Sequence, residues 1–157
     1  MTDFLSFFKN LRSPKVMPQD DPDFGKISYY GEETGIWQTH SIIEDPGNHA
    51  KYSFTAIPGD HKGPFAESRS FLLRKNANLP ALWSLCTPTL EEVCDQFKDS
   101  GLKKPVTETF LLADIAMEDP FENSGQWSVG FETKTDFWLY VLVHIKDETV
   151  ITYSCDT

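Results

Sequence analysis

The stretch from Pro64 to Lys98, PFAESRSFLLRKNANLPALWSLCTPTLEEVCDQFK, is the long helical passage of this 157-residue chain. In its second half, apolar residues recur at i, i+3, i+4 and i+7, which places them on one face of a helix. These residues are Leu90, Val93, Cys94 and Phe97. A helix with one apolar face must bury it against another element, and the rest of the chain offers strands. The stretch therefore predicts an α+β protein.

Proline and glycine set the expected helix boundaries. Thr87 followed by Pro88 predicts a helix start, because proline lacks only an N–H that the first turn does not use. A capping box beginning at Thr89 is a competing start two residues later. Asp99, Ser100 and Gly101 predict the end of this helix, because glycine can adopt the left-handed conformation of a helix C-cap. The first half then contains one helix ending near Asn76 or Asn78 and a short apolar piece from about Pro80.

Alternating or continuous apolar residues predict strands on both sides of the helices. Before them the candidates are Phe24–Tyr30, Ile36–Ile43 and Ala50–Ile57, and after them Phe110–Met117, Gln126–Glu132, Phe137–Ile145 and Thr149–Ser154. Short turns between these strands favour antiparallel pairing. We expect an antiparallel sheet of about six or seven strands, with the helical insertion (about 64–98) on one face.

The N-terminal region divides into a helix and a linker. Residues 1–13 carry apolar side chains at amphipathic helical spacing, and such a short helix needs a docking surface to be stable. Its own domain is the favoured surface over a partner or a membrane, because Asp3 and only two cations make a poor membrane anchor. Residues 14–22 are polar and broken by proline, which indicates a linker. Residues 23–157 are expected to form one α+β domain.

The composition limits the kinds of partner. The formal net charge is −10, from 24 acidic and 14 basic residues. This balance argues against direct nucleic-acid binding, which needs a basic surface. It would steer the chain toward a basic partner, although an acidic surface also serves solubility alone.

The cysteines and the hydropathy bear on the compartment. Cys86, Cys94 and Cys155 are an odd number and suggest reduced thiols in a cytosolic protein. No apolar run approaches the ~20 residues of a membrane span, and the start of the chain lacks a signal-peptide pattern. We expect a cytoplasmic protein without a membrane span.

The sequence contains no local metal or cofactor motif. None of the four histidines has a second histidine or a cysteine at metal-ligand spacing. One loop combines an acid, a base and a cation in Asp60, His61 and Lys62, between Pro58 and Pro64. This loop is the candidate site of a small hydrolase-like enzyme, but a solvated connector into the helix is the favoured interpretation. The prediction is no metal, no cofactor and no catalytic residue.

Acidic residues at predicted turns provide the other candidate site. If the hairpin ends meet, they form an acidic rim around exposed aromatic anchors, as protein-binding surfaces do. The alternative is that turns are polar because they are hydrated. The candidate binding residues are Trp37, Glu118, Asp119, Glu122, Trp127, Asp136, Trp138, Asp147 and Glu148.

The order of these features resembles small uncharacterised bacterial domains associated with polymorphic-toxin immunity proteins. The likeness rests on the entry from Asp21 to Gly25, Trp37 in the second strand, a third strand ending near Pro58, the helical insert and the final strands. It covers residues 21 to 155 in outline, and the chain departs from it at Pro80, at Pro88 and in its last residues. The resemblance implies a binding role for an acidic protein that neutralises a basic toxin domain. It carries no catalytic residues.

Three hypotheses follow. A non-enzymatic protein-binding module that blocks a basic partner leads. A small enzyme using the loop at Asp60, His61 and Lys62 comes second. An adaptor working through the apolar residues of the N-terminal helix comes third.

Overall fold

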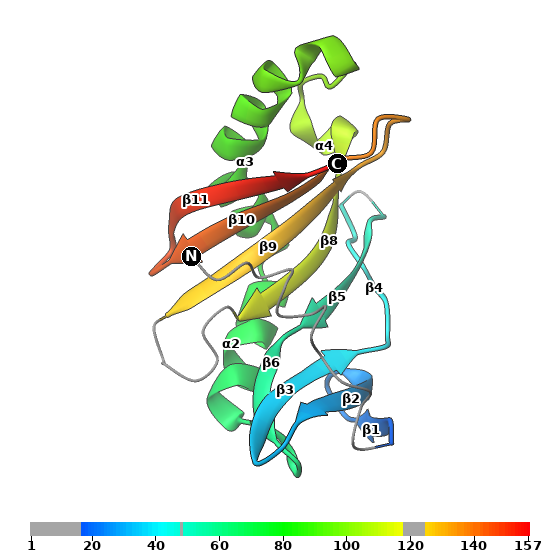
Figure 1. The fold of residues 1–157 in the computed structure, drawn as a ribbon, viewed down its shortest axis with the longest axis vertical. Coiled ribbons are helices and arrows are strands. Elements are labelled where there is room, and N and C mark those ends of the chain that lie inside the picture. Colours follow the sequence, from blue (N-terminus) through cyan, green and yellow to red (C-terminus); the bar gives the residue numbers. More distant parts are fainter. Residues whose placement is uncertain (1–16, 48, 118–124) are drawn as a thin grey trace.

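A computed structural model describes residues 17–47, 49–117 and 125–157 and shows an α+β fold (Figure 1). The predicted class is therefore confirmed. The helix expected over residues 1–13 lies outside the described residues. Within the expected linker, residues 19–21 form a strand that pairs with the next strand along the chain.

The first sheet is antiparallel and has the strand order β1-β2-β3-β6-β7. Its strands are β1 (Gln19–Asp21), β2 (Gly25–Gly31), β3 (Thr34–Thr39), β6 (Ile57–Asp60) and β7 (Gly63–Pro64). Its inner face contributes Ile27, Tyr29 and Trp37 to the core.

The second sheet has the order β11-β10-β9-β8-β5-β4. Its strands are β4 (Ile43–Glu44), β5 (Lys51–Thr55), β8 (Phe110–Met117), β9 (Gln126–Thr133), β10 (Tyr140–Lys146) and β11 (Thr149–Asp156). All its pairs are antiparallel except β5 with β8, which is parallel. The helices connect β5 and β6 to β8, which gives the long crossover that parallel pairing needs.

The expected single sheet of six or seven antiparallel strands is thus replaced by two sheets. The chain changes sheets at Ala56, whose φ of 49° lies in the left-handed region. The residues before it pair with β8, whereas those after it pair with β3. The alternation from Ala50 runs unbroken as far as Ala56, and only the consecutive apolar residues Ala56 and Ile57 depart from it at the corner.

The helices are α2 (Ala66–Asn76), α3 (Leu79–Gln96), the 3-10 turn η1 (Lys98–Ser100) and the short α4 (Val106–Thr109). The predicted helix start at Thr87 is wrong, because α3 continues through Pro88. Its true start is at Asn78, whose side chain accepts a hydrogen bond from the Ala81 N–H. The buried stripe of α3 runs on both sides of the exposed Pro88, and burying it outweighs one missing backbone hydrogen bond.

The helices lie on one face of the six-stranded sheet, behind it in the view of Figure 1. The contact is aromatic. The ring centroids of Trp83 of α3 and Phe131 lie 4.9 Å apart, and those of Phe71 of α2 and Trp127 lie 5.7 Å apart in an edge-to-face arrangement. No described helix covers the opposite face of the sheet, which carries Asp114, Tyr140 and His144 together with the buried Ala116, Ser128 and Leu142. We call it the open face.

Candidate functional site

The alternation of side chains along a strand assigns residues to the open face. Phe137 packs on Phe97 just after α3, and Leu139 is fully buried. Tyr140, the first residue of β10, therefore points toward the open face. Trp138 is 50% exposed.

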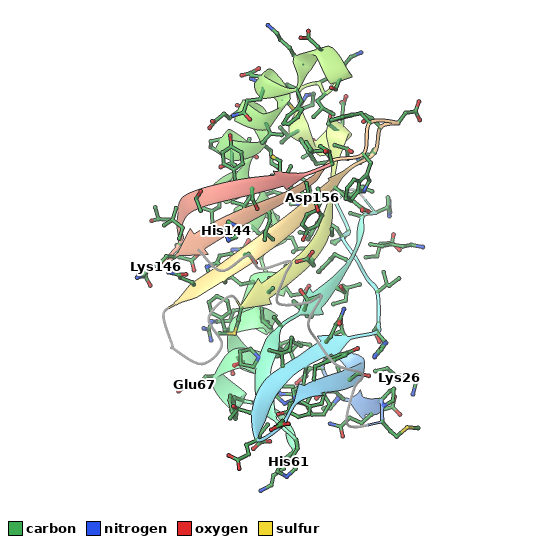
Figure 2. All side chains as sticks on the ribbon, in the orientation of Figure 1. Lys26, His61, Glu67, His144, Lys146 and Asp156 are labelled. Carbon is green, nitrogen blue, oxygen red and sulfur yellow. The ribbon has the colours of Figure 1, made fainter. Side chains whose placement is uncertain are left out.

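Strand register then brings three carboxylates to this end of the open face. Tyr140 is aligned with Glu132 on one side and with Asp156 on the other. Asp114 is aligned with Gly130, two residues before Glu132. We call this group the acidic corner: Asp114, Glu132, Trp138, Tyr140 and Asp156. Figure 2 shows Asp156 at one end of the sheet and His144 and Lys146 toward the other.

Tyr140 and Asp114 interact directly across the central strand. The Tyr140 hydroxyl donates a 2.5 Å hydrogen bond to Oδ2 of Asp114. A Cβ at Gly130 would lie 2.1 Å from that hydroxyl and 2.4 Å from Oδ2. Gly130 is therefore required sterically, because any side chain there would occupy the path of the bond.

The Asp114 carboxyl has a strongly perturbed pKa. Burial, with a smaller contribution from the neighbouring Glu132 charge, raises the pKa of this carboxyl from the usual 3.8 to about 6. The hydroxyls of Tyr140 and Thr55 act in the opposite direction. Oδ1 of Asp114 is inaccessible and accepts no hydrogen bond within the described chain, and the same holds for the hydroxyl of Ser128 on the next strand.

The acidic corner also has no cationic partner among residues 17–47, 49–117 and 125–157. Among the described residues, none forms an ion pair with Asp114, Glu132 or Asp156. Lys51 of β5 has the parity of the open face but makes no such contact. An isolated carboxylate in a dehydrated site is costly, and a cation supplied from outside would relieve that cost.

Asp21 is a nearly buried carboxylate with a structural role, and it provides a comparison for Asp114. Its side chain is 7% exposed and accepts two hydrogen bonds from Arg69 of α2. Burial raises the Asp21 pKa, but the bonds from Arg69 and from the Asp23 and Phe24 N–H groups bring it below its usual value. In the part of the chain that the structure describes, Asp114 has no equivalent cationic partner, and this contrast marks the acidic corner as a candidate site.

The predicted aromatic anchors divide between core and surface. Trp37 and Trp127 are buried, with 0% and 1% exposure, whereas Trp138 is accessible. The Trp37 indole donates a 2.9 Å hydrogen bond to the Asp60 carbonyl, which ties β3 to β6. Of the three tryptophans, only Trp138 is available to a partner.

The predicted acids do not form one rim. Asp136 lies in the β9–β10 turn beside Trp138, whereas Asp147 and Glu148 lie in the β10–β11 turn, roughly 20 Å away along a seven-residue strand. Glu148 is occupied by an ion pair with Lys75. The remaining three acids, Glu118, Asp119 and Glu122, lie outside the described residues.

The loop with Asp60, His61 and Lys62 is a tight turn between β6 and β7. The Asp60 carboxylate accepts the Lys62 backbone N–H at 2.7 Å, which is a turn-closing contact. His61 is exposed and lies at the far end of the five-stranded sheet (Figure 2).

A pocket of about 500 Å³ lies elsewhere, beside the start of α3. Its lining includes Asp45, Leu79, Pro80 and Trp83. The Asp45 carboxylate accepts hydrogen bonds from the Trp83 indole and from the Gly47 N–H, so its oxygens are already engaged. The pocket is apolar and contains no reactive pair.

Sequence reasoning missed Asp114, Glu132, Tyr140 and Asp156 as site residues. Asp114 interrupts the apolar run FLLADIAM, and a charged residue in mid-strand was the available signal. The others occupy ordinary polar positions of their strands. Only the register reveals that they meet.

Searches for ion sites, membrane spans and relatives gave no assignment. In the described part of the chain, no three His, Cys, Asp or Glu side chains are grouped to hold a metal ion. No described helix has the length and apolar character to cross a membrane. Comparison with protein-family models, curated proteins and solved structures found no match.

Proposed function

We propose that this chain is a non-enzymatic binding protein whose partner is a basic protein, and that the partner docks on the acidic corner. One observation carries the proposal. Asp114, Glu132 and Asp156 gather on the open face near the start of β10, which the half-exposed Trp138 precedes along the chain, and none has an ion-pair partner in the described chain.

The chemistry of the corner suits a lysine or arginine side chain. A cation between Glu132 and Asp156 gains two opposite charges at once and makes ionised Asp114 less costly. The exposed indole of Trp138 offers a cation–π surface and an apolar anchor next to those charges. The net charge of −10 would speed the encounter at low salt.

An inhibitory role of the immunity type fits this mode of binding. A basic toxin domain needs its cations to hold an anionic substrate. An acidic protein that pairs with those cations would exclude the substrate without making or breaking a bond. The proposal therefore needs no catalytic group on this chain.

The direct test uses the product of the neighbouring gene as the candidate partner. Binding is measured by calorimetry at several salt concentrations, with the wild type and with the double variant Glu132→Gln, Asp156→Asn. We expect tight, salt-sensitive binding that the double variant weakens at least tenfold. Trp138→Ala should weaken binding at every salt concentration, because its contact is partly apolar.

The matched control is Asp147→Asn at the opposite end of the sheet, which removes an exposed acid without touching the corner. It should bind like the wild type. Equal losses from the corner and the control variants would show a nonspecific charge effect and would sink the proposal. So would partner binding that none of these variants affects.

A further inference from the structure

We infer that the partner contributes an extended, lysine- or arginine-rich segment that adds to the six-stranded sheet as a strand beside β11. The inference rests on the proposed function and deepens it, because it names the conformation and chemistry of the segment that binds.

The first support is the outer edge of β11. This strand has eight residues, and among the described strands it pairs only with β10. Every second residue of such an edge directs its N–H and C=O away from the sheet. The other sheet edges are short: β4 and β7 have two residues each, and β1 has three. In the described chain, β11 is therefore the edge long enough to template a strand.

The second support is the lack of protection along this edge. Proteins normally guard edge strands with lysine, proline, bulges or a covering element. The β11 sequence, TVITYSCD, contains no lysine, arginine, proline or glycine. Its one irregularity is opposite His144 and Ile145, near its start. Six of the eight side chains are exposed, including Ile151 at 51%. An open edge of this composition is a pairing surface.

The third support is charge on both faces of the edge. On the open face, Asp156 of β11 continues the acidic corner. On the helix face, the Tyr153 hydroxyl donates to Glu92 of α3 at 2.9 Å, which places a carboxylate beside the strand. Successive side chains of an added strand point to opposite faces. Lysines at alternate or at successive positions would therefore meet carboxylates.

A second copy of this chain is a poorer occupant. Antiparallel pairing of two β11 edges would place Asp156 of each copy opposite Thr149 of the other, next to the exposed Asp147 and Glu148, and like charges across an edge are destabilising. A basic segment has no such penalty. The charge on both faces thus selects a basic segment over a second copy.

The test uses synthetic peptides and the full chain. The probe is a fluorescent peptide in which lysine alternates with threonine, compared with the same peptide carrying glutamate in place of lysine. Two further forms of the lysine peptide are N-methylated along one backbone edge or along the other. Fluorescence anisotropy reports binding. Strand addition predicts that the lysine peptide binds and that the glutamate peptide does not. It also predicts that one N-methylated form binds with at least tenfold lower affinity, whereas the other binds with the affinity of the unmethylated peptide.

A matched pair of protein variants locates the site. Ile151→Lys places a cation on β11, whereas Ile42→Lys makes the same change at another exposed isoleucine, which is 67% exposed. The Ile151→Lys variant should bind the lysine peptide at least fivefold more weakly than the wild type, and the Ile42→Lys variant should bind it with unchanged affinity. Alkylation of Cys155, the exposed cysteine of the chain, should slow when the peptide is bound.

Several results would overturn the inference. Equal binding of both N-methylated forms would mean side-chain docking without strand addition. Absence of lysine-peptide binding, while the neighbouring gene's product still binds through Glu132, would overturn strand addition and leave the proposed function standing. Concentration-dependent protection of Cys155 without peptide would assign the edge to a second copy. If no variant of the acidic corner weakened partner binding, the proposed function itself would be overturned instead.

Discussion

The hydroxyl of Tyr140 on β10 crosses Gly130 on β9 and donates a 2.5 Å hydrogen bond to Oδ2 of Asp114 on β8. One bond thus spans three strands of the sheet. It fixes the aromatic side chain at the centre of the acidic corner and orients the carboxyl whose second oxygen is buried without a partner in the described chain.

Gly130→Ala should destabilise the fold by about 1–3 kcal/mol, because the added methyl group overlaps the Tyr140 hydroxyl. Urea unfolding measures the loss. The same change in a Tyr140→Phe background should cost less, since the nearest clashing atom is gone. Equal costs in the two backgrounds would contradict the crossing of Tyr140 over Gly130.

Asp114→Asn should change the pH dependence of stability. The folded pKa of about 6 lies above the usual 3.8, so the unfolded chain loses its proton first as the pH rises. The wild type therefore loses stability between about pH 4 and pH 6, by about 2–3 kcal/mol, and no further above that range. The asparagine variant lacks this loss. Denaturation at intervals from pH 4 to pH 7.5 should show the variant gaining on the wild type as the pH rises, and a constant difference would refute the raised pKa.

Arg69→Met should destabilise the fold by about 1–3 kcal/mol, because it leaves the Asp21 carboxylate nearly buried without its cation. The lowered Asp21 pKa provides stability above its unfolded pKa, and that stability is lost as the pH falls through the folded pKa. The cost of the substitution should accordingly shrink in acid. Arg69→Lys should recover part of the stability, and thermal unfolding at neutral and acidic pH would show both effects.

Pro88→Ala should stabilise α3 by about 1–2 kcal/mol. Pro88 is exposed inside the helix and cannot donate the backbone hydrogen bond of its position, whereas alanine can. The gain is reduced because proline also restricts the unfolded chain. A raised melting temperature with unchanged partner binding is the expected result. A lowered one would mean that α3 is not continuous at this residue.

The helical passage from Pro64 to Lys98 shows how far the sequence reaches. The spacing of Leu90, Val93, Cys94 and Phe97 determined a helix with one apolar face, and that face is packed on the sheet. Pro88 led to a wrong predicted helix boundary, because a capping signal is local. The continuity of α3 comes instead from the burial of apolar residues on both sides of Pro88. The α+β class followed from patterns of period 3.6 and period 2, which are properties of the chain itself.

Only the tertiary structure decided which strands pair and therefore what the open face presents. The positive φ at Ala56 sends the chain from one sheet to the other, and two consecutive apolar residues do not by themselves predict such a change. Asp114, Glu132 and Asp156 are far apart along the chain and meet only through the register of β8, β9, β10 and β11. A one-residue slip in that register would move each of them to the helix face. Side-chain periodicity is local and can be read from sequence, whereas pairing depends on contacts across the whole fold.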